Sequence, residues 1–257
     1  MPILVCVKSR ITKPQTYTVY GLNSAKQVLK ADRFEITTID ICKNSAAEKD
    51  PVISALIKKT AVAPRSWGKE KFTREYKDYR TQGIAVSFKG PVTTPLPSFA
   101  NGKTNMGFLL GDHISDPQNL GQIIRTAECA GLDGLILPER GGTQLTDAAL
   151  QVSQGAFVTL PIYSCGNVQQ TLQQLKDDGF WIVGVENDEQ AKVWYEVDYS
   201  GKVAIVVGSE GQGIRQLVRR RCDFLATIPM QGQINSLNVS AAVSAVLFER
   251  QRQINAE

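Results

Sequence analysis

VAIVVGSEGQGI (residues 203–214) is a short, continuously apolar run that ends in a glycine-rich turn. Similar apolar runs recur after residue 106, and stretches with helical spacing separate them. The runs lie at 107–110, 134–137, 181–185, 203–207 and 224–228, and the helical stretches lie near 119–130, 167–177, 212–220 and 238–252. This alternation predicts an α/β fold, a mainly parallel sheet flanked by helices. Because ligands bind such sheets beyond the carboxyl ends of the strands, the loops that follow strands are the places to look for a site.

The turn at the end of this run carries Gly208, Gly211 and Gly213, in the order G-x-x-G-x-G. That order is neither the dinucleotide fingerprint G-x-G-x-x-G nor a P-loop, which needs a Gly-Lys pair. Glycines still allow a ligand to approach the backbone closely. Glu210 stands at the crest of the turn, where no structural reason requires it, although a solvated carboxylate is the alternative. The turn therefore predicts a binding loop.

A second polar loop, HISDPQNLGQIIRTAECAG (residues 113–131), opens the same region. Gly121 is a poor choice inside a helix, so we expect an exposed loop through Asn119 and Gly121 and a helix that begins near Gln122. Arg125 would then lie early in that helix, close to unpaired backbone N–H groups, where a phosphate binds readily. An ion pair with the glutamate three residues further on is the alternative for this arginine.

The third loop leads into the C-terminal helix, in IPMQGQINSLNVSAAVSAVLFERQR (residues 228–252). Either Ser236 or Asn238 suits the N-cap of this strongly apolar helix. Because much of its circumference lacks polar groups, we expect the helix to be buried or packed against a partner. Core packing does not explain why Ser236, Asn238 and Ser240 cluster at its entrance.

Composition excludes several classes of protein. The chain has 257 residues, 42% hydrophobic and 21% charged, which is ordinary for one large or two modest globular domains. No apolar run approaches the ~20 residues of a membrane span, and the N-terminal MPILVCVKSR does not resemble a secretory signal, so we expect a cytoplasmic protein. The five cysteines are scattered and His113 is the single histidine, which argues against disulfides and metal sites.

Charge is divided unevenly along the chain. Residues 1–90 hold 17 Lys and Arg against 8 Asp and Glu, a net charge of +9, whereas residues 91–257 hold 12 against 17, a net charge of −5. The stretch PVTTPLPSFANGKTN (91–105) is rich in proline and threonine and marks a boundary. We therefore predict a basic RNA-binding domain at 1–90, a linker at 91–105 and a second domain at 106–257. A merely solvated basic face is the alternative.

The basic region has the pattern of a small α/β unit. Its expected strands are 3–7, 34–41 and 84–88, and its expected helices lie in GLNSAKQVLKA (21–31) and DPVISALIKK (50–59). In WGKEKFTREYKDYR (67–80), five cations alternate with Trp67, Phe72, Tyr76 and Tyr79. Cations suit phosphates and aromatic faces suit bases, so this segment is a candidate RNA contact. An amphipathic surface helix explains the same pattern.

Together, the three loops resemble the motifs of the SpoU (TrmH-like) branch of the SPOUT RNA methyltransferases. The first motif, N-x-G-x-x-x-R-T-A, matches Asn119, Gly121, Arg125, Thr126 and Ala127; the second, G-x-E-x-x-G, matches Gly208, Glu210 and Gly213; the third, I-P-M-x-G-x-x-x-S-L-N-V-S, matches 228–240. The match covers about 106–257. In the first domain, YGLNSAKQVLKA and TQGIAVSF look like the substrate-binding domain of the rRNA-modifying members, which is similar to a small ribosomal protein, except that Thr81 replaces a histidine.

The resemblance implies transfer of a methyl group from S-adenosylmethionine to a ribose 2′-hydroxyl of RNA, with rRNA favoured over tRNA. It also implies a homodimer formed through the C-terminal domain, and a C-terminal trefoil knot that holds the cofactor. By motif matching, the cofactor-binding residues would be Gly208, Ile228, Met230 and Leu237. The catalytic residues would be Asn119, Arg125, Glu210, Ser236 and Asn238, with no metal.

The implied reaction is compatible with these residue types. The sulfonium donor is already activated, so no metal or covalent intermediate is needed, but the ribose hydroxyl must lose its proton. Arginine is a poor base, so Arg125 would bind the target phosphate and polarise the 2′-oxygen. A phosphate oxygen or Glu210 would accept the proton. Asn119 and Asn238 would fix the geometry, and Ser236 would contact the substrate or the cofactor, because alignment of two bound reactants lowers the barrier substantially.

Three other functions fit part of the pattern. A catalytically idle RNA-binding factor for ribosome assembly would keep the basic domain but would not need the polar loop residues. A doubly wound nucleotide-binding enzyme fits the sheet but not the glycine spacing. A tRNA 2′-O-methyltransferase differs from the favoured function only in its RNA.

Overall fold

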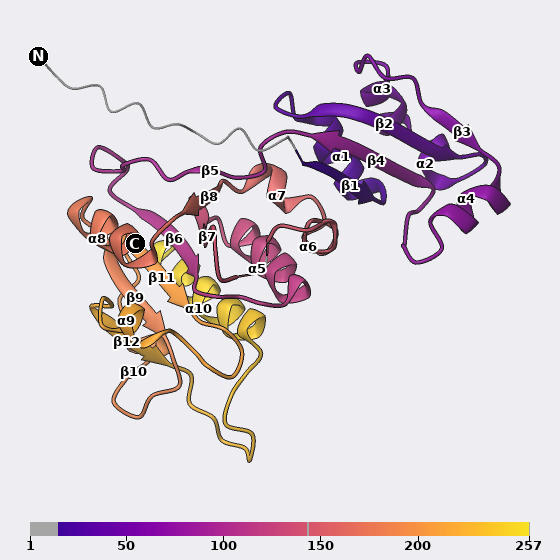
Figure 1. The fold of residues 1–257 in the computed structure, drawn as a ribbon. Coiled ribbons are helices and arrows are strands. Elements are labelled where there is room, and N and C mark those ends of the chain that lie inside the picture. Colours follow the sequence, from indigo (N-terminus) through magenta and orange to yellow (C-terminus); the bar gives the residue numbers. More distant parts are fainter. Residues whose placement is uncertain (1–14, 143, 257) are drawn as a thin grey trace, which may run out of the picture.

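The computed structural model describes residues 15–142 and 144–256. It contains a small β-sheet near the N-terminus and a large one formed by the rest of the chain (Figure 1). The expected strand at 3–7 lies outside the described residues. Within the described part of the chain, no helix is both long enough and apolar enough to cross a membrane.

The large sheet is parallel throughout and has the strand order β10-β12-β9-β11-β6-β7-β8-β5. Its strands are β5 (Thr94–Pro95), β6 (Met106–Gly111), β7 (Gly134–Pro138), β8 (Ile162–Cys165), β9 (Trp181–Val185), β10 (Lys192–Val193), β11 (Lys202–Val207) and β12 (Phe224–Thr227). The five predicted runs are β6, β7, β9, β11 and β12, so the predicted α/β fold with a mainly parallel sheet is confirmed. Strand β8, which has only four residues, was not predicted.

Helices cover both faces of this sheet (Figure 1). They are α5 (Pro117–Cys129), α6 (Asp147–Val152), α7 (Ala156–Thr159), α8 (Val168–Asp177), α9 (Gln216–Arg219) and α10 (Val239–Ile254), with a 3-10 turn, η1, at Trp194–Glu196. Strand β6 shows why its sequence is apolar without interruption. Leu109 belongs to the core that contains Ile123 of α5, whereas Leu110 belongs to a second core with Leu172 of α8. Both faces of the strand are therefore buried.

Helix α5 differs from the prediction at its start. It begins at Pro117, and the Asp116 side chain caps it by accepting a hydrogen bond of 2.9 Å from the backbone N–H two residues on. Asn119 and Gly121 therefore lie inside the helix and are buried, so the exposed loop predicted there is wrong. A Cβ atom on Gly121 would lie 2.5 Å from Cβ of Val152 in α6. The two helices pack too closely for a side chain at this position, which outweighs the low helix propensity of glycine.

The small sheet has the strand order β1-β4-β2-β3. Its elements are β1 (Thr16–Tyr20), α1 (Leu22–Lys30), β2 (Glu35–Cys42), α2 (Ala46–Lys49), α3 (Pro51–Ile57), β3 (Arg65–Trp67), α4 (Lys69–Glu75) and β4 (Ile84–Lys89). β4 lies between β1 and β2 and is antiparallel to both. The predicted strands at 34–41 and 84–88 and both predicted helices are present.

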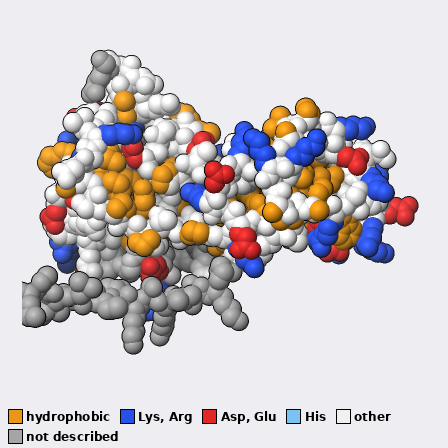
Figure 2. Space-filling view, turned by 90° about the horizontal axis from the view of Figure 1, so that it is seen from above, with side chains coloured by type: hydrophobic (Ala, Val, Ile, Leu, Met, Phe, Trp, Pro, Cys, Tyr) orange, Lys and Arg blue, Asp and Glu red, His pale blue; other side chains and the backbone are white. Residues whose placement is uncertain are grey.

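Aromatic side chains of the 67–80 segment gather around a buried carboxylate. Asp40, only 2% exposed, accepts hydrogen bonds from the Arg65 guanidinium, from the Trp67 indole N–H at 2.9 Å and from the Tyr76 hydroxyl. Burial alone would raise the pKa of Asp40, but these hydrogen bonds hold it below its usual range. The five cations of the segment stay exposed, and Figure 2 shows Lys and Arg side chains over this end of the molecule. The segment therefore combines an aromatic cluster with a basic surface.

Side chains of α6 and α7 dock the small sheet onto the large one. Gln151 accepts a hydrogen bond from the Tyr20 backbone N–H at 2.8 Å and donates one to the Tyr20 carbonyl at 3.0 Å. Asp147 accepts one from the Thr18 backbone N–H at 3.2 Å. The Phe157 ring of α7 stacks on the Phe88 ring of β4, so the apolar core extends from the large sheet to the small one. The edge of β1 that faces away from β4 is thereby paired with side chains.

The segment 91–105 connects the two sheets and also packs on the large one. β5 adds an edge strand beside β8. Asp178 accepts hydrogen bonds from the Ser98 hydroxyl at 2.8 Å and from the Phe99 backbone N–H at 2.7 Å. The Phe99 ring lies against Phe108, with 4.7 Å between the ring centroids. Part of the stretch predicted as a linker is therefore a structural element of the large sheet.

Candidate active site

A pocket of about 560 Å³ opens at the carboxyl ends of β9, β11 and β12. We call it the glycine-loop pocket, because loop 208–213 forms one wall; loop 228–239 forms another. It lies where the sheet topology predicts a ligand site. Seven of the nine predicted site residues line it: Gly208, Glu210, Ile228, Met230, Ser236, Leu237 and Asn238.

The glycines of the loop are required by contacts across its base. A Cβ atom on Gly208 would lie 2.0 Å from the carbonyl carbon of Gly213, so no side chain fits there. Ser209 and Gly213 close the loop with two backbone hydrogen bonds, of 2.9 and 3.2 Å. Gly213 also has a φ of 65°, and a Cβ there would lie 2.1 Å from Oε1 of Glu186. The glycine spacing thus brings backbone close to backbone and leaves Glu210 at the crest of the loop.

Three polar side chains from three segments of the chain are joined beside the pocket. The Asn119 amide group donates a hydrogen bond to the Glu210 carboxylate, and its oxygen accepts one from the Asn238 amide at 2.9 Å. The Asn238 oxygen in turn accepts a hydrogen bond from the Ser240 backbone N–H at 2.9 Å and so caps α10. Asn119 is buried. It therefore fixes Glu210 relative to the start of α10.

Arg125 is the predicted site residue that the structure places away from the pocket. It lies on the exposed face of α5 and makes no hydrogen bond or ion pair with another described residue. The alternative ion pair with Glu128 is absent; that carboxylate instead accepts a hydrogen bond from the Thr159 hydroxyl at 3.0 Å. The Arg125 guanidinium is therefore free to contact another molecule.

Comparison with known proteins shows the family of this chain. Residues 107–248, more than half of the chain, match the SpoU rRNA Methylase family. The chain belongs to this family. RlmB of Photobacterium profundum, a 23S rRNA (guanosine-2′-O-)-methyltransferase, is 33% identical over 92% of the chain and 98% of its own length. A TrmH family tRNA/rRNA methyltransferase of Staphylococcus saprophyticus is 44% identical over 57% of the chain, and the match spans 59% of that protein.

Solved structures share the fold over nearly the whole chain. The AdoMet-bound rRNA methyltransferase of Sinorhizobium meliloti has a TM-score of 0.77 at 22% identity and covers 93% of this chain and 88% of its own. The SpoU methyltransferase AviRb of Streptomyces viridochromogenes, in complex with AdoMet, has a TM-score of 0.75 at 20% identity and covers 94% and 91%. Members of the SpoU family use S-adenosylmethionine, so the predicted cofactor is confirmed.

Glu186 and Asn187 also line the glycine-loop pocket, and neither was predicted from the sequence. Glu186 directly follows β9, and its carboxylate accepts a hydrogen bond from the Ile214 backbone N–H at 2.9 Å. Asn187 donates a hydrogen bond to the Asn235 carbonyl at 2.6 Å. The loop after β9 thereby ties the two other loops together. Its position at the carboxyl end of the predicted strand 181–185 is the signal that identifies it.

The side chains of the glycine-loop pocket suit catalysis by the orientation of bound reactants. Its polar side chains are carboxylates, amides and two serine hydroxyls. No group of three or more His, Cys, Asp or Glu in 15–142 and 144–256 could hold a metal ion. Its apolar side chains include Ile228, Met230 and Leu237. A pocket of this size, lined by polar and apolar side chains together, can hold a small-molecule cofactor.

Proposed function

We propose that this chain transfers the methyl group of S-adenosylmethionine to the 2′-hydroxyl of a ribose in rRNA. The observation that carries the proposal is the joining of Asn119, Glu210 and Asn238 beside the glycine-loop pocket. These residues belong to three separate motifs of the SpoU family, and the hydrogen bonds bring them together at one place. The likeness to an RlmB 23S rRNA 2′-O-methyltransferase over almost the whole chain supports ribose methylation and rRNA.

The glycine-loop pocket fits S-adenosylmethionine in chemistry. Its Ile228, Met230 and Leu237 side chains suit the adenosine part, and loop backbone around Gly208 suits close approach of a polar ligand. Polar groups from Ser236 and Glu210 suit the charged amino-acid part and the reacting end. When bound, the cofactor supplies an activated methyl group. This chain must therefore supply position and a route for one proton.

The hydrogen-bond network supplies both the position of the reacting groups and the route for the proton. Asn119 holds the Glu210 carboxylate, and Asn238 holds Asn119, so the carboxylate is oriented before RNA arrives. Glu210 or a phosphate oxygen of the RNA would accept the proton of the 2′-hydroxyl while the methyl group passes from the sulfonium sulfur to the 2′-oxygen. The carbon–sulfur bond breaks in this step, and the cofactor leaves as a neutral thioether. Asn119 and Asn238 act through Glu210 and through the start of α10, which makes them positioning residues.

Arg125 completes the proposal as a phosphate-binding group that works in a dimer. Two large apolar side chains, Leu237 at the pocket and Phe248 on α10, are 47% and 48% exposed, and α5 packs beside α10. We propose that two chains pair through this surface, in the C-terminal domain. Arg125, exposed on α5, then serves the partner's pocket, where it binds the target phosphate and polarises the 2′-oxygen.

Further features belong to the same proposal. The residues 1–90 form an RNA-binding domain, supported by their +9 charge and by the exposed cations of 67–80. The loops around 208–213 and 228–238 form the trefoil knot expected of the family, supported by family membership and by the contacts that tie them to Glu186 and Asn187. The proposal also places the enzyme in the cytoplasm, supported by its likeness to the 23S rRNA methyltransferase of Photobacterium profundum.

The first test is methyl transfer from labelled S-adenosylmethionine to total RNA of a strain that lacks this gene, followed by nucleoside analysis. We expect label in one 2′-O-methylnucleoside of rRNA. Label in tRNA would change the substrate, and label on a base would overturn the mechanism. Cofactor binding without labelling of any RNA would point to an assembly intermediate as substrate, and no cofactor binding would favour an idle assembly factor.

The Arg125→Ala variant tests the dimer. We expect it to abolish transfer and to leave cofactor affinity largely intact, because Arg125 lies outside the glycine-loop pocket. Mixing it with a Glu210→Gln variant restores one complete site per mixed dimer if Arg125 serves the partner. A strong loss of cofactor binding in Arg125→Ala, or inactive mixed dimers, would overturn this role.

A further inference from the structure

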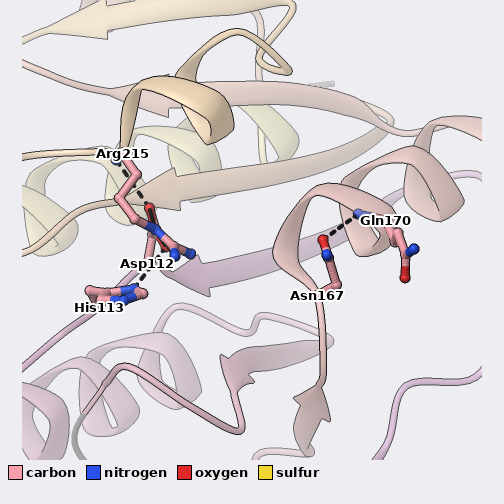
Figure 3. Close-up of polar contacts among 5 residues, drawn as sticks. All are labelled: Asp112, His113, Asn167, Gln170 and Arg215. Atoms are coloured by element: carbon pink, nitrogen blue, oxygen red, sulfur yellow. Dashed lines mark hydrogen bonds and ion pairs between the residues drawn. The ribbon is translucent and has the colours of Figure 1, made fainter.

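A second pocket, of about 320 Å³, opens at the same edge of the large sheet. Its lining residues follow the ends of β6, β7 and β8 or start α8, and Arg215 closes it from the side of α9. We call it the cationic pocket, because its described lining includes His113, Arg140 and Arg215 and no Asp or Glu. Figure 3 shows Arg215 and His113 on one side of this region and Asn167, at the start of α8, on the other.

Arg215 is held in place by a buried carboxylate. Asp112 is fully buried and accepts hydrogen bonds from Nε of Arg215 at 3.0 Å, from Nη2 at 2.6 Å and from the Arg215 backbone N–H at 3.1 Å. The Arg215 side chain is nevertheless 47% exposed. An arginine has five N–H donors in a planar fork. Asp112 therefore occupies one edge of the guanidinium and leaves Nη1 for a ligand.

Arg140 and the start of α8 add free donors. Arg140 is exposed and makes no hydrogen bond or ion pair with another described residue. The Asn167 side chain caps Gln170, which leaves the first backbone N–H groups of α8 without an acceptor in the described chain. The neighbouring carboxylate Glu139 does not line the pocket. The lining thus offers several donors and a positive charge that Asp112 only partly offsets.

His113 completes the wall in an unusual conformation. Its φ is 65°, a left-handed value that non-glycine residues rarely adopt, and its Nδ1 lies 3.2 Å from Asp112. A Cβ atom on Gly141 would lie 2.3 Å from Nε2 of His113, so the ring fits only because position 141 has no side chain. Both residues line the pocket, and in its protonated form the imidazole adds an Nε2–H donor for an anion.

The two pockets are close neighbours along the chain and along the sheet. Gly213 lines the glycine-loop pocket and Arg215, two residues later, lines the cationic pocket. The segment after β6 likewise carries His113 at one pocket and Asn119 at the other. The two pockets therefore adjoin along the carboxyl edge of the large sheet.

We propose that the cationic pocket binds a phosphodiester group of the RNA strand next to the methylated nucleotide. This inference rests on the proposed function for the identity of the strand. The donors that recognise the ligand are the guanidinium groups of Arg140 and Arg215, the His113 ring and the start of α8. They recognise a phosphate without reading a base, so the pocket sets the register of the strand and not its sequence.

The salt dependence of RNA binding tests the proposal. We would measure the affinity of the full chain for 23S rRNA transcribed in vitro, at several salt concentrations, for wild type, Arg140→Gln and His113→Asn. Asparagine is chosen because it tolerates the left-handed φ of position 113. Loss of one phosphate contact should lower the slope of log affinity against log salt by about 1. Arg220→Gln is the matched control, since Arg220 is exposed and lines neither pocket.

The expected result is a lower slope in Arg140→Gln and His113→Asn and an unchanged slope in Arg220→Gln, with S-adenosylmethionine affinity equal in all. Equal slopes in all three variants would overturn the proposal. A wild type that methylates no ribose, but shows these slope differences, would remove the proposed function and keep the pocket as an RNA phosphate site.

The single histidine gives a direct second measurement. In protein labelled with 15N-histidine, a short oligouridylate should shift the His113 ring resonances in wild type and in Arg220→Gln, and should shift them less in Arg140→Gln. Inorganic phosphate at equal ionic strength should act more weakly than the oligonucleotide. Resonances that respond to inorganic phosphate and not to RNA would overturn the proposal in favour of a site for a free phosphate.

Discussion

The glycine-loop pocket and the cationic pocket lie at one edge of one sheet but are built differently. The first is made of loop backbone, apolar side chains and amides that hold Glu210. The second contains Arg140, which is unpaired among the described residues, and Arg215, which the buried Asp112 holds in place. The difference teaches that one parallel sheet can support a cofactor site with carboxylates and an anion site with guanidinium groups side by side, because each strand end contributes its own loop.

The largest expected effect is a loss of methyl transfer that leaves RNA binding at the cationic pocket unchanged. In Gly208→Ala the new Cβ would collide with the Gly213 backbone and displace the loop. We expect methyl transfer to fall about 100-fold or more, because small displacements at a reacting centre cost that much. The slope of RNA affinity against salt should stay at the wild-type value. Gly232→Ala is the control, since a Cβ atom there would have nothing within 4 Å. RNA binding lost together with cofactor binding would mean that the pockets are one unit.

A smaller effect is expected from Asn119→Ala. The change removes the link between Asn238 and Glu210 but removes no group from the pocket lining. Turnover should fall about 10- to 100-fold, less than after loss of a direct donor to the reacting atoms, while cofactor affinity changes little. Steady-state kinetics and calorimetry check the two quantities. Gln118→Ala, exposed on the same helix, should behave as wild type. A large loss of cofactor affinity would contradict the positioning role.

The smallest effect concerns Asp112→Asn. The amide keeps the shape but not the charge that orients Arg215, so the free energy of unfolding should fall by about 1–3 kcal/mol. The salt slope of RNA binding should fall by less than in Arg140→Gln, because the Arg215 guanidinium stays in the pocket. Denaturant unfolding and the same binding series measure both. Asp32→Asn, on the exposed turn before Phe34, is the control of equal charge. A rise in RNA affinity would show that Asp112 only neutralises Arg215.

The two pockets also differ in how far the sequence predicts them. Seven residues of the glycine-loop pocket were predicted. Gly208, Glu210, Ser236 and Asn238 stand out in polar loops that follow apolar runs, whereas Ile228, Met230 and Leu237 were named only through the resemblance to the family. The cationic pocket was not predicted, because His113, Arg140, Asn167 and Arg215 come from four separate segments and each is unremarkable alone. They come together only because the strands β6, β7 and β8 are parallel and end at the same edge of the sheet.

The fold shows the same limit. The continuously apolar runs, which alternate with helical stretches, predict the parallel sheet, because both faces of each such strand are buried. The predicted start of α5 is wrong, because the reason for Gly121 is the close approach of α6, a contact with Val152 that no local pattern records. The predicted place of Arg125 is wrong for the same reason. Because α5 begins at Pro117, Arg125 lies well inside the helix and not beside the unpaired backbone N–H groups of its start.

The docking of the small sheet has a consequence for the choice of RNA. Gln151 and Asp147 hold β1, and Phe99 holds the connecting segment, so little slack separates the basic surface from the glycine-loop pocket. A loose tether would let the basic surface search a wide volume. A docked domain instead keeps the basic surface and the glycine-loop pocket at one fixed spacing. An RNA whose bound segment and target ribose have that spacing contacts both, and an RNA of another shape contacts only one.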